Sequence, residues 1–407
     1  MLTGTVYVNT SATLTIEPGV TVDFGQYYMQ VNGTLNARGQ SGSNIVFTTT
    51  YYREPRIEFL AGCSGWDEQS GFGCIIENAS FGRVYLIVNG SVKINGNIFN
   101  GTSNSPLFVT GGSPIITNNL FNLASSGVTV TGGSPVLSYN SLIGGQVQFG
   151  ISLGSGSTAF ISNNNISRCQ IGIYSSANVN IQGNMIINSI QGIVNNGPST
   201  VIQNNVIAGN YVGIMGAGNI QSNTIVKNSI GIQASSATVR NNNIYGNSQN
   251  SITVTSTNTI DATNNWWGTT DTAAINQTIL DSKTSSYGTG TVIFVPFLLQ
   301  PNPLAPPLPN ITLNPIVFVT PPPPTNRPSP SPTLTPIPTP VPTPSPTPKI
   351  MPGSPLSLGG STFAETISQF DIIGLAKLVL IALGIMWVII ILVSVDRKFA
   401  KKENKKP

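Results

Sequence analysis

The sequence contains no histidine and few charged residues of either sign. Lysine and arginine together number 18 and aspartate and glutamate 14, and charged residues make up 8% of the 407 residues. No Asp or Glu occurs between Glu77 and Asp261. Histidine is the most frequent general base, glycoside hydrolysis needs two carboxyl groups, and bound metals need carboxylate, imidazole or thiolate ligands. These absences predict that the chain is not an enzyme and has no catalytic, cofactor-binding or metal site.

Cysteine is also scarce, with three residues in all. Cys63 and Cys74 flank one loop, so they are a candidate disulfide if the loop lies in an oxidising compartment. Cys169 is left over and is interpreted as a small buried apolar residue. The spacing of the three matches no zinc motif.

What the sequence does contain is an asparagine that recurs at intervals of 18 to 24 residues. Each copy is followed two positions later by Leu, Ile or Trp, and four copies also precede a Gly-Ile pair by eight residues. The copies are Asn118, Asn140, Asn164, Asn184, Asn205, Asn223, Asn242 and Asn264. A period near 21 residues predicts one supersecondary unit stacked on itself. The alternative, that Asn is merely frequent in loops, does not explain why the offsets recur together.

The repeat is too short to hold a strand, a crossover helix and a returning strand, which need about 30 residues. Apolar residues come in short runs with period-two flanks, and Ile, Val, Thr and Asn dominate over helix formers. We therefore expect coils of short strands stacked about 4.8 Å apart. The recurring Asn would form a ladder, because its amide can bond both the local corner and the Asn one coil away.

The opening and the closing part of the repeat region resemble a known family. Residues 12–22, 31–37 and 44–48 are similar to the opening of right-handed parallel β-helix repeat proteins of archaeal and bacterial cell surfaces. Asn-Asn-Trp-Trp-Gly at 264–268, followed by 290–297, resembles their closing part. The resemblance covers roughly residues 1–300 and implies an all-β fold, a right-handed parallel β-helix (solenoid) of about 12 to 14 coils. It implies no single activity, because such proteins range from polysaccharide enzymes to structural surface proteins.

Composition divides the chain into five segments. The β-helix is expected at 1–298, and an extended linker rich in Pro, Thr and Ser at 299–357, which holds 22 of the 30 prolines. A juxtamembrane segment (358–371), one transmembrane α-helix (372–395) and a basic tail (396–407) would follow. A buried core helix at 372–395 is the alternative, but a strand solenoid offers no place for one.

Charge predicts the orientation of this single span. The basic tail belongs in the cytoplasm, which places the β-helix outside the cell membrane. Several Asn-x-Ser/Thr sites agree with an extracellular glycoprotein. The first residues show no signal peptide, so we expect that the chain begins inside a longer gene product; a tail-anchored protein with a cytosolic β-helix is the alternative. Residues 1–300 hold 9 basic and 10 acidic residues, which predicts no nucleic-acid partner.

One insertion, 51–74, is chemically richer than the rest. Its candidate ligand residues combine an aromatic ring with carboxylates and arginines, a mixture suited to sugars. They are Arg53, Glu54, Arg56, Glu58, Trp66, Asp67 and Glu68. The alternative is a solvated loop with local ion pairs and its Trp packed on the coils.

The sequence favours a non-catalytic surface protein with a structural, adhesive or glycan-binding role, whose partners would be the membrane, glycans or envelope proteins. The first alternative is a carbohydrate-active enzyme, similar to polysaccharide lyases or hydrolases, with its chemistry near 51–74. The second is an accessory factor of the cell envelope.

Overall fold

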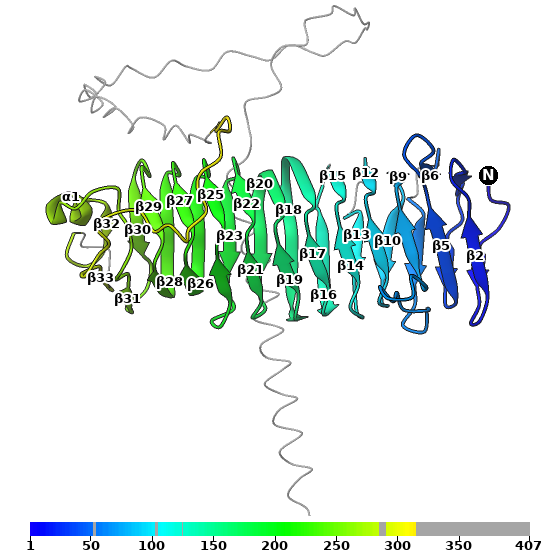
Figure 1. Ribbon diagram of the computed structural model, residues 1–407, viewed down its shortest axis with the longest axis horizontal. Helices are drawn as coiled ribbons and strands as arrows, with labels where there is room; N and C mark the ends of the chain where they lie inside the picture. The colour runs from blue at the N-terminus through cyan, green and yellow to red at the C-terminus, as the bar shows by residue number, and fades with distance from the viewer. Residues whose placement is uncertain (52–53, 102–104, 124, 285–289, 315–407) are drawn as a thin grey trace, which may run out of the picture. The chain divides into compact units, whose positions relative to one another are not determined.

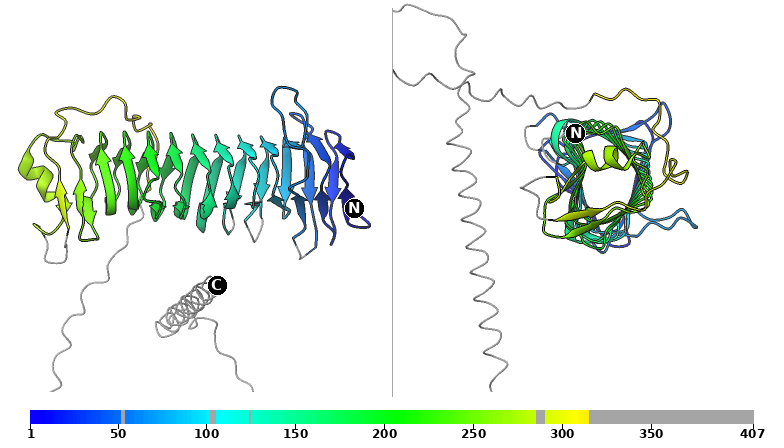
Figure 2. Two further views of the ribbon diagram at one scale, coloured as in Figure 1. Left: turned by 90° about the horizontal axis from the view of Figure 1, so that it is seen from below. Right: turned by 90° about the vertical axis from the view of Figure 1, so that its left-hand side faces the viewer.

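The computed structural model describes residues 1–51, 54–101, 105–123, 125–284 and 290–314. It confirms an all-β parallel solenoid, of about 12 turns, in which strands stack along one axis (Figure 1). Each coil contributes strands to three columns, called A, B and C here in chain order. The view along the axis shows the coils superimposed around one core (Figure 2).

Column A pairs in parallel from β1 to β32. Its own strands are β1 (Val6–Val8), β4 (Met29–Val31), β7 (Arg56–Phe59), β10 (Tyr85–Val88), β13 (Leu107–Val109), β16 (Val128–Gly133), β23 (Gln191–Asn195), β30 (Asn250–Val254) and β32 (Ile279–Leu280).

Column B pairs in the same way from β2 to β33. Its own strands are β2 (Thr13–Ile16), β5 (Thr34–Arg38), β8 (Ile75–Glu77), β11 (Lys93–Asn95), β14 (Ile115–Thr117), β17 (Val136–Ser138), β19 (Phe160–Ser162), β21 (Asn180–Gln182), β24 (Val201–Gln203), β31 (Thr259–Asp261) and β33 (Thr291–Ile293).

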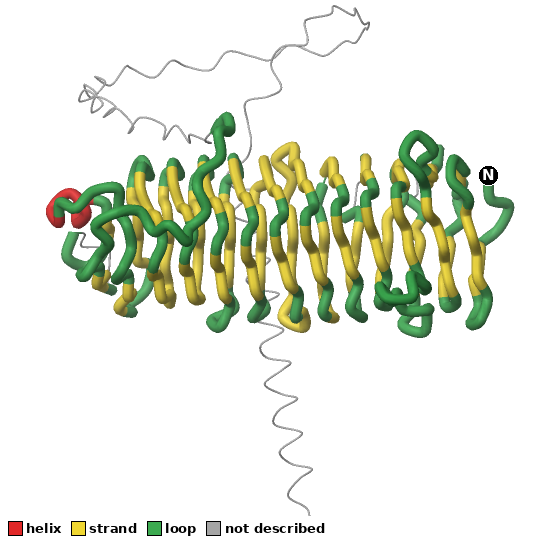
Figure 3. The backbone as a smooth tube through the Cα atoms, viewed as in Figure 1, coloured by secondary structure: helices red, strands yellow, loops and turns green. Residues whose placement is uncertain are grey.

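Column C runs from β3 to β29, and longer strands turn a corner between two columns (Figure 3). Its own strands are β3 (Thr21–Asp23), β6 (Ile45–Thr48), β9 (Ala79–Gly82), β12 (Ile98–Asn100), β15 (Leu120–Leu123), β22 (Met185–Ile187), β25 (Val206–Ala208), β27 (Thr224–Val226) and β29 (Asn243–Tyr245). The corner-turning strands are β18 (Ser141–Ser157), β20 (Asn165–Ser175), β26 (Val212–Gln221) and β28 (Ile230–Arg240).

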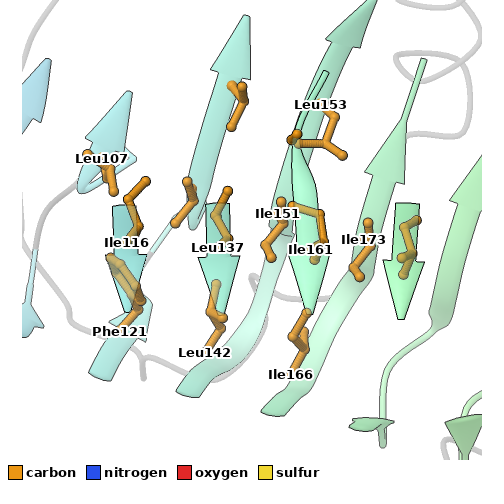
Figure 4. Close-up of a cluster of buried hydrophobic side chains, with 14 of the residues drawn as sticks. Leu107, Ile116, Phe121, Leu137, Leu142, Ile151, Leu153, Ile161, Ile166 and Ile173 are labelled. Carbon is orange, nitrogen blue, oxygen red and sulfur yellow. The ribbon is translucent and has the colours of Figure 1, made fainter. Parts of the chain in front are cut away.

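The core is built from equivalent positions of successive coils. Strands alternate inward and outward residues with period two, so pairing in register stacks like on like. Phe81, Phe99 and Phe121 of column C stack with ring centroids 4.4 and 4.7 Å apart, and Leu142 and Ile166 continue the same inward row. Figure 4 shows such side chains pointing into the core from neighbouring coils.

The corner between columns B and C carries the asparagine ladder. Each ladder Asn from Asn97 to Asn242 donates its backbone N–H and its side-chain amide to the Oδ1 of the Asn one coil further on; for Asn205 and Asn223 both distances are 2.9 Å. The same amide also bonds backbone carbonyls, such as Ile181 O at 2.9 Å. Ladder members are Asn97, Asn119, Asn140, Asn164, Asn184, Asn205, Asn223, Asn242 and Asn265.

Two positions of the expected ladder are out of register by one residue. Asn118 and Asn264 precede the ladder members Asn119 and Asn265, and both adopt a left-handed backbone with φ of 58°. The left-handed residue before each ladder Asn turns the corner, and Asn tolerates that conformation. In an Asn-Asn pair the first residue therefore turns the chain and the second enters the ladder.

The corner between columns C and A holds a shorter ladder that the sequence analysis did not predict. Ser189 N donates to Asn210 Oδ1 at 2.9 Å, Asn210 N to Asn228 Oδ1 at 2.9 Å, and Asn228 N to Asn247 Oδ1 at 3.0 Å. The Gly of each Gly-Ile pair follows this corner. A Cβ on Gly172 would lie 2.6 Å from the Gly192 carbonyl oxygen of the next coil, which explains why glycine recurs there.

The end of the described chain packs back on column C. Asn302 N donates to Asn243 Oδ1 at 2.7 Å, and Asn314 N donates to Asn188 Oδ1 at 2.8 Å. Leu308, Ile311 and Leu313 cover an outer apolar cluster that Ile187, Val206, Ala208 and Val226 form. This strap, residues 298–314, crosses the outside of column C as the yellow segment of Figure 1. The start of the expected linker 299–357 is therefore bound to the β-helix rather than free.

One short helix, α1 (Thr272–Gln277), lies at the far end of the coils, with Asp271 as its N-cap. In the part of the chain that the structure describes, no helix is long and apolar enough to cross a membrane. The segments expected at 358–371, 372–395 and 396–407 lie outside the described residues, as does the linker beyond residue 314.

Replacing Asn205 with Leu should lower the free energy of unfolding by about 1–3 kcal/mol, because buried donors and acceptors of two coils lose their partners. Urea unfolding measures the change. Asn204→Gly is the matched control: Asn204 is exposed with a φ of 55°, which Gly adopts readily, so little change is expected. Equal stability of N205L and the unmodified chain would show that the ladder does not support the fold.

Candidate functional site

The structure separates the candidate ligand residues of the 51–74 insertion. Arg56 and Glu58 lie in β7 on the outer face of column A, and Glu54 lies two residues before this strand. Trp66, Asp67 and Glu68 lie in the loop before β8, where Trp66 and Glu68 contact Lys93 of column B. Arg53 lies outside the described residues. The described residues of the insertion therefore contribute to two faces of the coil and do not form one site.

On the outer face of column A, Tyr7, Tyr28, Gln30, Arg56 and Glu58 form a group that we call the Tyr28–Arg56 cluster. Arg56 Nε and Nη2 each donate to Glu58 Oε2 at 3.2 Å, and Gln30 Nε2 donates to the same oxygen at 3.5 Å. The Arg56 guanidinium carbon lies 4.4 Å from the Tyr28 ring centroid. The Tyr7 and Tyr28 hydroxyls are 3.3 Å apart.

Strand alternation explains why these side chains meet. In β7, Ile57 and Phe59 are fully buried and Arg56 and Glu58 point outward. Parallel pairing sets Glu58 beside Gln30 of β4. The Arg56 and Glu58 side chains remain 33% and 22% exposed, so the pair is reachable from solvent but fixed by its neighbours.

Aromatic side chains extend the outer face of column A beyond the cluster. Tyr85 of β10 pairs with Arg56 in register, and its ring meets that of Phe108 edge to face at 6.0 Å. Further along the axis, Phe149 and Tyr174 have ring centroids 5.6 Å apart. Partly exposed rings along one face offer stacking surfaces to pyranose rings.

Trp66 occupies a different environment, enclosed by cations from column B. The guanidinium carbon of Arg38 lies 5.1 Å and the Nζ of Lys93 lies 4.9 Å from the Trp66 ring. Lys93 Nζ also contacts both carboxylate oxygens of Glu68, at 2.9 and 3.1 Å, and this hydrogen bond lowers the pKa of Glu68. Asp67 accepts from the N–H of Gln69 and the hydroxyl of Ser70 within its own turn, which lowers its pKa. These contacts fasten the loop to the coils.

All three cysteines are buried: Cys63 and Cys74 in the N-terminal coils, and Cys169 in the middle of the solenoid. Cys63 and Cys74 are adjacent free thiols, and their mutual hydrogen bond together with burial raises the pKa of Cys63. The disulfide between them remains a prediction. Cys169 is buried, and desolvation raises its pKa to about 12, so it packs as a small apolar residue.

Tyr28, Gln30 and Tyr85 were not predicted from the sequence. An alignment of the coils could have identified these residues. In such an alignment, residues opposite Arg56 and Glu58 in the preceding and following coils must also point outward from column A. The repeat was aligned only from Asn118 onward, which left the N-terminal coils without a register.

Asp261, the first acidic residue after Glu77 in the sequence, forms an ion pair. Asp261 of β31 accepts a hydrogen bond from Arg240 Nη2 of β28, and also from the Thr263 hydroxyl at 2.8 Å. The bond from Arg240 is the main cause that lowers the pKa of Asp261 to about 2. This pair, with Arg240 48% and Asp261 33% exposed, lies on the outer face of column B.

Two family models match parts of the chain. The right handed beta helix region matches residues 60–207, and the model of the periplasmic copper-binding protein (NosD) matches residues 137–282. No curated protein matches the chain. Within the described residues, no three His, Cys, Asp or Glu side chains come together to hold a metal ion.

Solved structures resemble the chain at low identity. A variant of the periplasmic alginate epimerase AlgG is 13% identical with a TM-score of 0.46, and the match covers 71% of this chain and 84% of the epimerase chain. A variant of the PL6 family alginate lyase AlyGC is 12% identical with a TM-score of 0.36, over 62% of this chain and 43% of the lyase chain. At these values the likeness concerns the fold alone.

The prediction that the chain is not an enzyme is corrected: an epimerase and a lyase are among the solved structures that resemble its fold, so the fold gives no support to a non-catalytic assignment. The prediction relied on what is missing between Glu77 and Asp261. The Tyr28–Arg56 cluster lies before that stretch, so the absence of carboxylates between Glu77 and Asp261 gives no information about the chemistry of the cluster.

Replacing Arg240 with Gln should raise the pKa of Asp261 from about 2 toward its ordinary value of 3.8. Because the folded-state pKa is the lower one, the pair stabilises the fold above about pH 4, and this contribution is lost as the pH falls toward 2. Carboxyl carbon chemical shifts measured against pH give the pKa. Lys227→Gln, an exposed change elsewhere, should leave it unaltered, and a pKa near 3.8 in the unmodified chain would refute the ion pair.

Proposed function

Because the chain is a right-handed parallel β-helix repeat protein, we propose that it acts on a polysaccharide that carries carboxylate groups. The polymer would lie along the outer face of column A, with one acidic sugar over the Tyr28–Arg56 cluster. The observation that carries this proposal is Arg56, a partly exposed guanidinium held over the Tyr28 ring and oriented by Glu58.

Each member of the cluster has a part in binding. A guanidinium binds a sugar carboxylate through two parallel hydrogen bonds, and its planar fork gives that contact its geometry. The rings of Tyr28 and Tyr85 provide apolar faces for pyranose rings. Glu58 and Gln30 offer acceptor and donor groups for sugar hydroxyls. Arg56 can exchange its exposed bond to Glu58 for the substrate carboxylate at little cost, because a partly exposed ion pair contributes little.

The chemistry that suits this cluster starts by removing a proton next to the carboxylate of the sugar. Such a step needs a cation that neutralises the carboxylate as negative charge develops, which is the role of Arg56. It also needs a base and an acid. The Glu58 carboxylate can accept the proton from the sugar carbon once Arg56 has turned to the substrate carboxylate. A tyrosine hydroxyl can donate a proton to the departing glycosidic oxygen, and the Tyr7 and Tyr28 hydroxyls share a hydrogen bond in the cluster. That bond raises the pKa of Tyr7, so its hydroxyl carries its proton at neutral pH. The cluster holds one carboxylate, Glu58, whereas glycoside hydrolysis uses two.

Arg56→Gln should weaken binding of a polyuronate such as alginate by about tenfold, because a charge-assisted bidentate contact is lost. Affinity electrophoresis through alginate-containing gels measures the binding, and absorbance of unsaturated sugar ends measures elimination. Arg168→Gln removes the same charge from an exposed position in the middle of the coils and is the matched control.

Equal loss of binding in both variants would mean that only net charge matters and would contradict the proposed site. Binding that R56Q weakens, without any new sugar product from several polyuronates, would contradict the catalytic part of the proposal. Product formation that R56Q abolishes and R168Q retains would support both parts.

A further inference from the structure

The corner between columns A and B bears a polar pocket that is separate from the Tyr28–Arg56 cluster. Its volume is about 390 Å³, within the range of small-molecule sites. Its main lining residues are Pro198, Asn219, Ser236, Thr238, Asn258 and Thr259. They come from four consecutive coils, from the corner before β24 to the start of β31.

Differences in corner length create the pocket. The length of the corner between columns A and B differs from coil to coil. The corner takes residues 196–200 in one coil, 217–218 in the next coil and 235–237 in the coil after that. The following coil uses 255–258, between the end of β30 and the start of β31. The two long corners therefore stand as walls, with Pro198 on one and Asn258 on the other, and the two short corners form the floor between them.

The polar groups that line the pocket indicate which kind of ligand it can bind. Hydroxyls and amides provide both donors and acceptors. Among the described residues, the side chains of Asn219, Ser236 and Thr238 form no hydrogen bond with the protein, so they can bond a ligand. The charged groups beside the pocket, Arg240 and Asp261, neutralise each other through their ion pair. The site thus suits a neutral ligand rich in hydroxyl groups.

We propose that this pocket binds one neutral sugar residue, as a free monosaccharide or as the end of a neutral glycan. The inference rests on the hydroxyl and amide groups that line a pocket between two long corners. This inference is independent of the function proposed for column A. Rims formed by Pro198 and Asn258 would limit the pocket to a single ring, since each wall closes one end along the axis.

Titration with methyl glycosides of glucose, galactose and mannose, followed by saturation-transfer NMR on the full chain, tests the proposal. We expect saturable binding of at least one of them with a Kd on the order of 1 mM, which is ordinary for a single small ring. Ser236→Phe, at an exposed floor position, should block the pocket, and Thr238→Val should weaken binding about fivefold to tenfold by removing one hydroxyl.

Ser155→Phe is the matched control, because Ser155 is exposed on the same corner of an earlier coil, outside the pocket. It should leave binding unchanged, and so should R56Q, which acts only on column A. Thermal unfolding of each variant shows whether it folds. Absence of saturable binding for all three glycosides, or binding that folded S236F retains in full, would overturn the proposal.

Discussion

The stacking of asparagine amides along one corner is the interaction on which the rest of the structure depends. From Asn119 onward, each ladder Oδ1 accepts two N–H groups from the coil before it, as Asn223 does from Asn205. These bonds satisfy backbone groups that a sharp buried corner would otherwise leave unpaired. They also hold adjacent coils in one register, and a slip by one residue would turn every inward side chain outward.

Because the register between coils is fixed, functional groups can vary only at outward-facing positions and at corners of different length. The Tyr28–Arg56 cluster arises because outward residues of β4 and β7 are brought side by side. The polar pocket between Pro198 and Asn258 arises because neighbouring corners differ in length. The strap 298–314 uses a third opportunity, the outer side of column C, where it covers an apolar cluster.

The sequence predicted the fold because periodic apolar residues and asparagines repeat their spacing along most of the chain. It misplaced Asn118 and Asn264, because in an Asn-Asn pair only backbone geometry distinguishes the residue that turns from the one that stacks. Tyr28 went unnoticed because the partners of β7 come from another coil. The strap was assigned to the linker because its proline content matches that of a free spacer, although Asn302 and Leu313 bind it to the coils.

Hydrogen exchange at the backbone amides of the ladder asparagines tests the central claim most directly. These N–H groups donate to side chains one coil away, so they should exchange as slowly as the core strand amides on either side of each corner. The left-handed residues that precede them differ in type from coil to coil, and the account predicts the same slow exchange at the ladder position whatever residue precedes it. Exchange of the ladder amides at the rate of exposed loops would contradict the account.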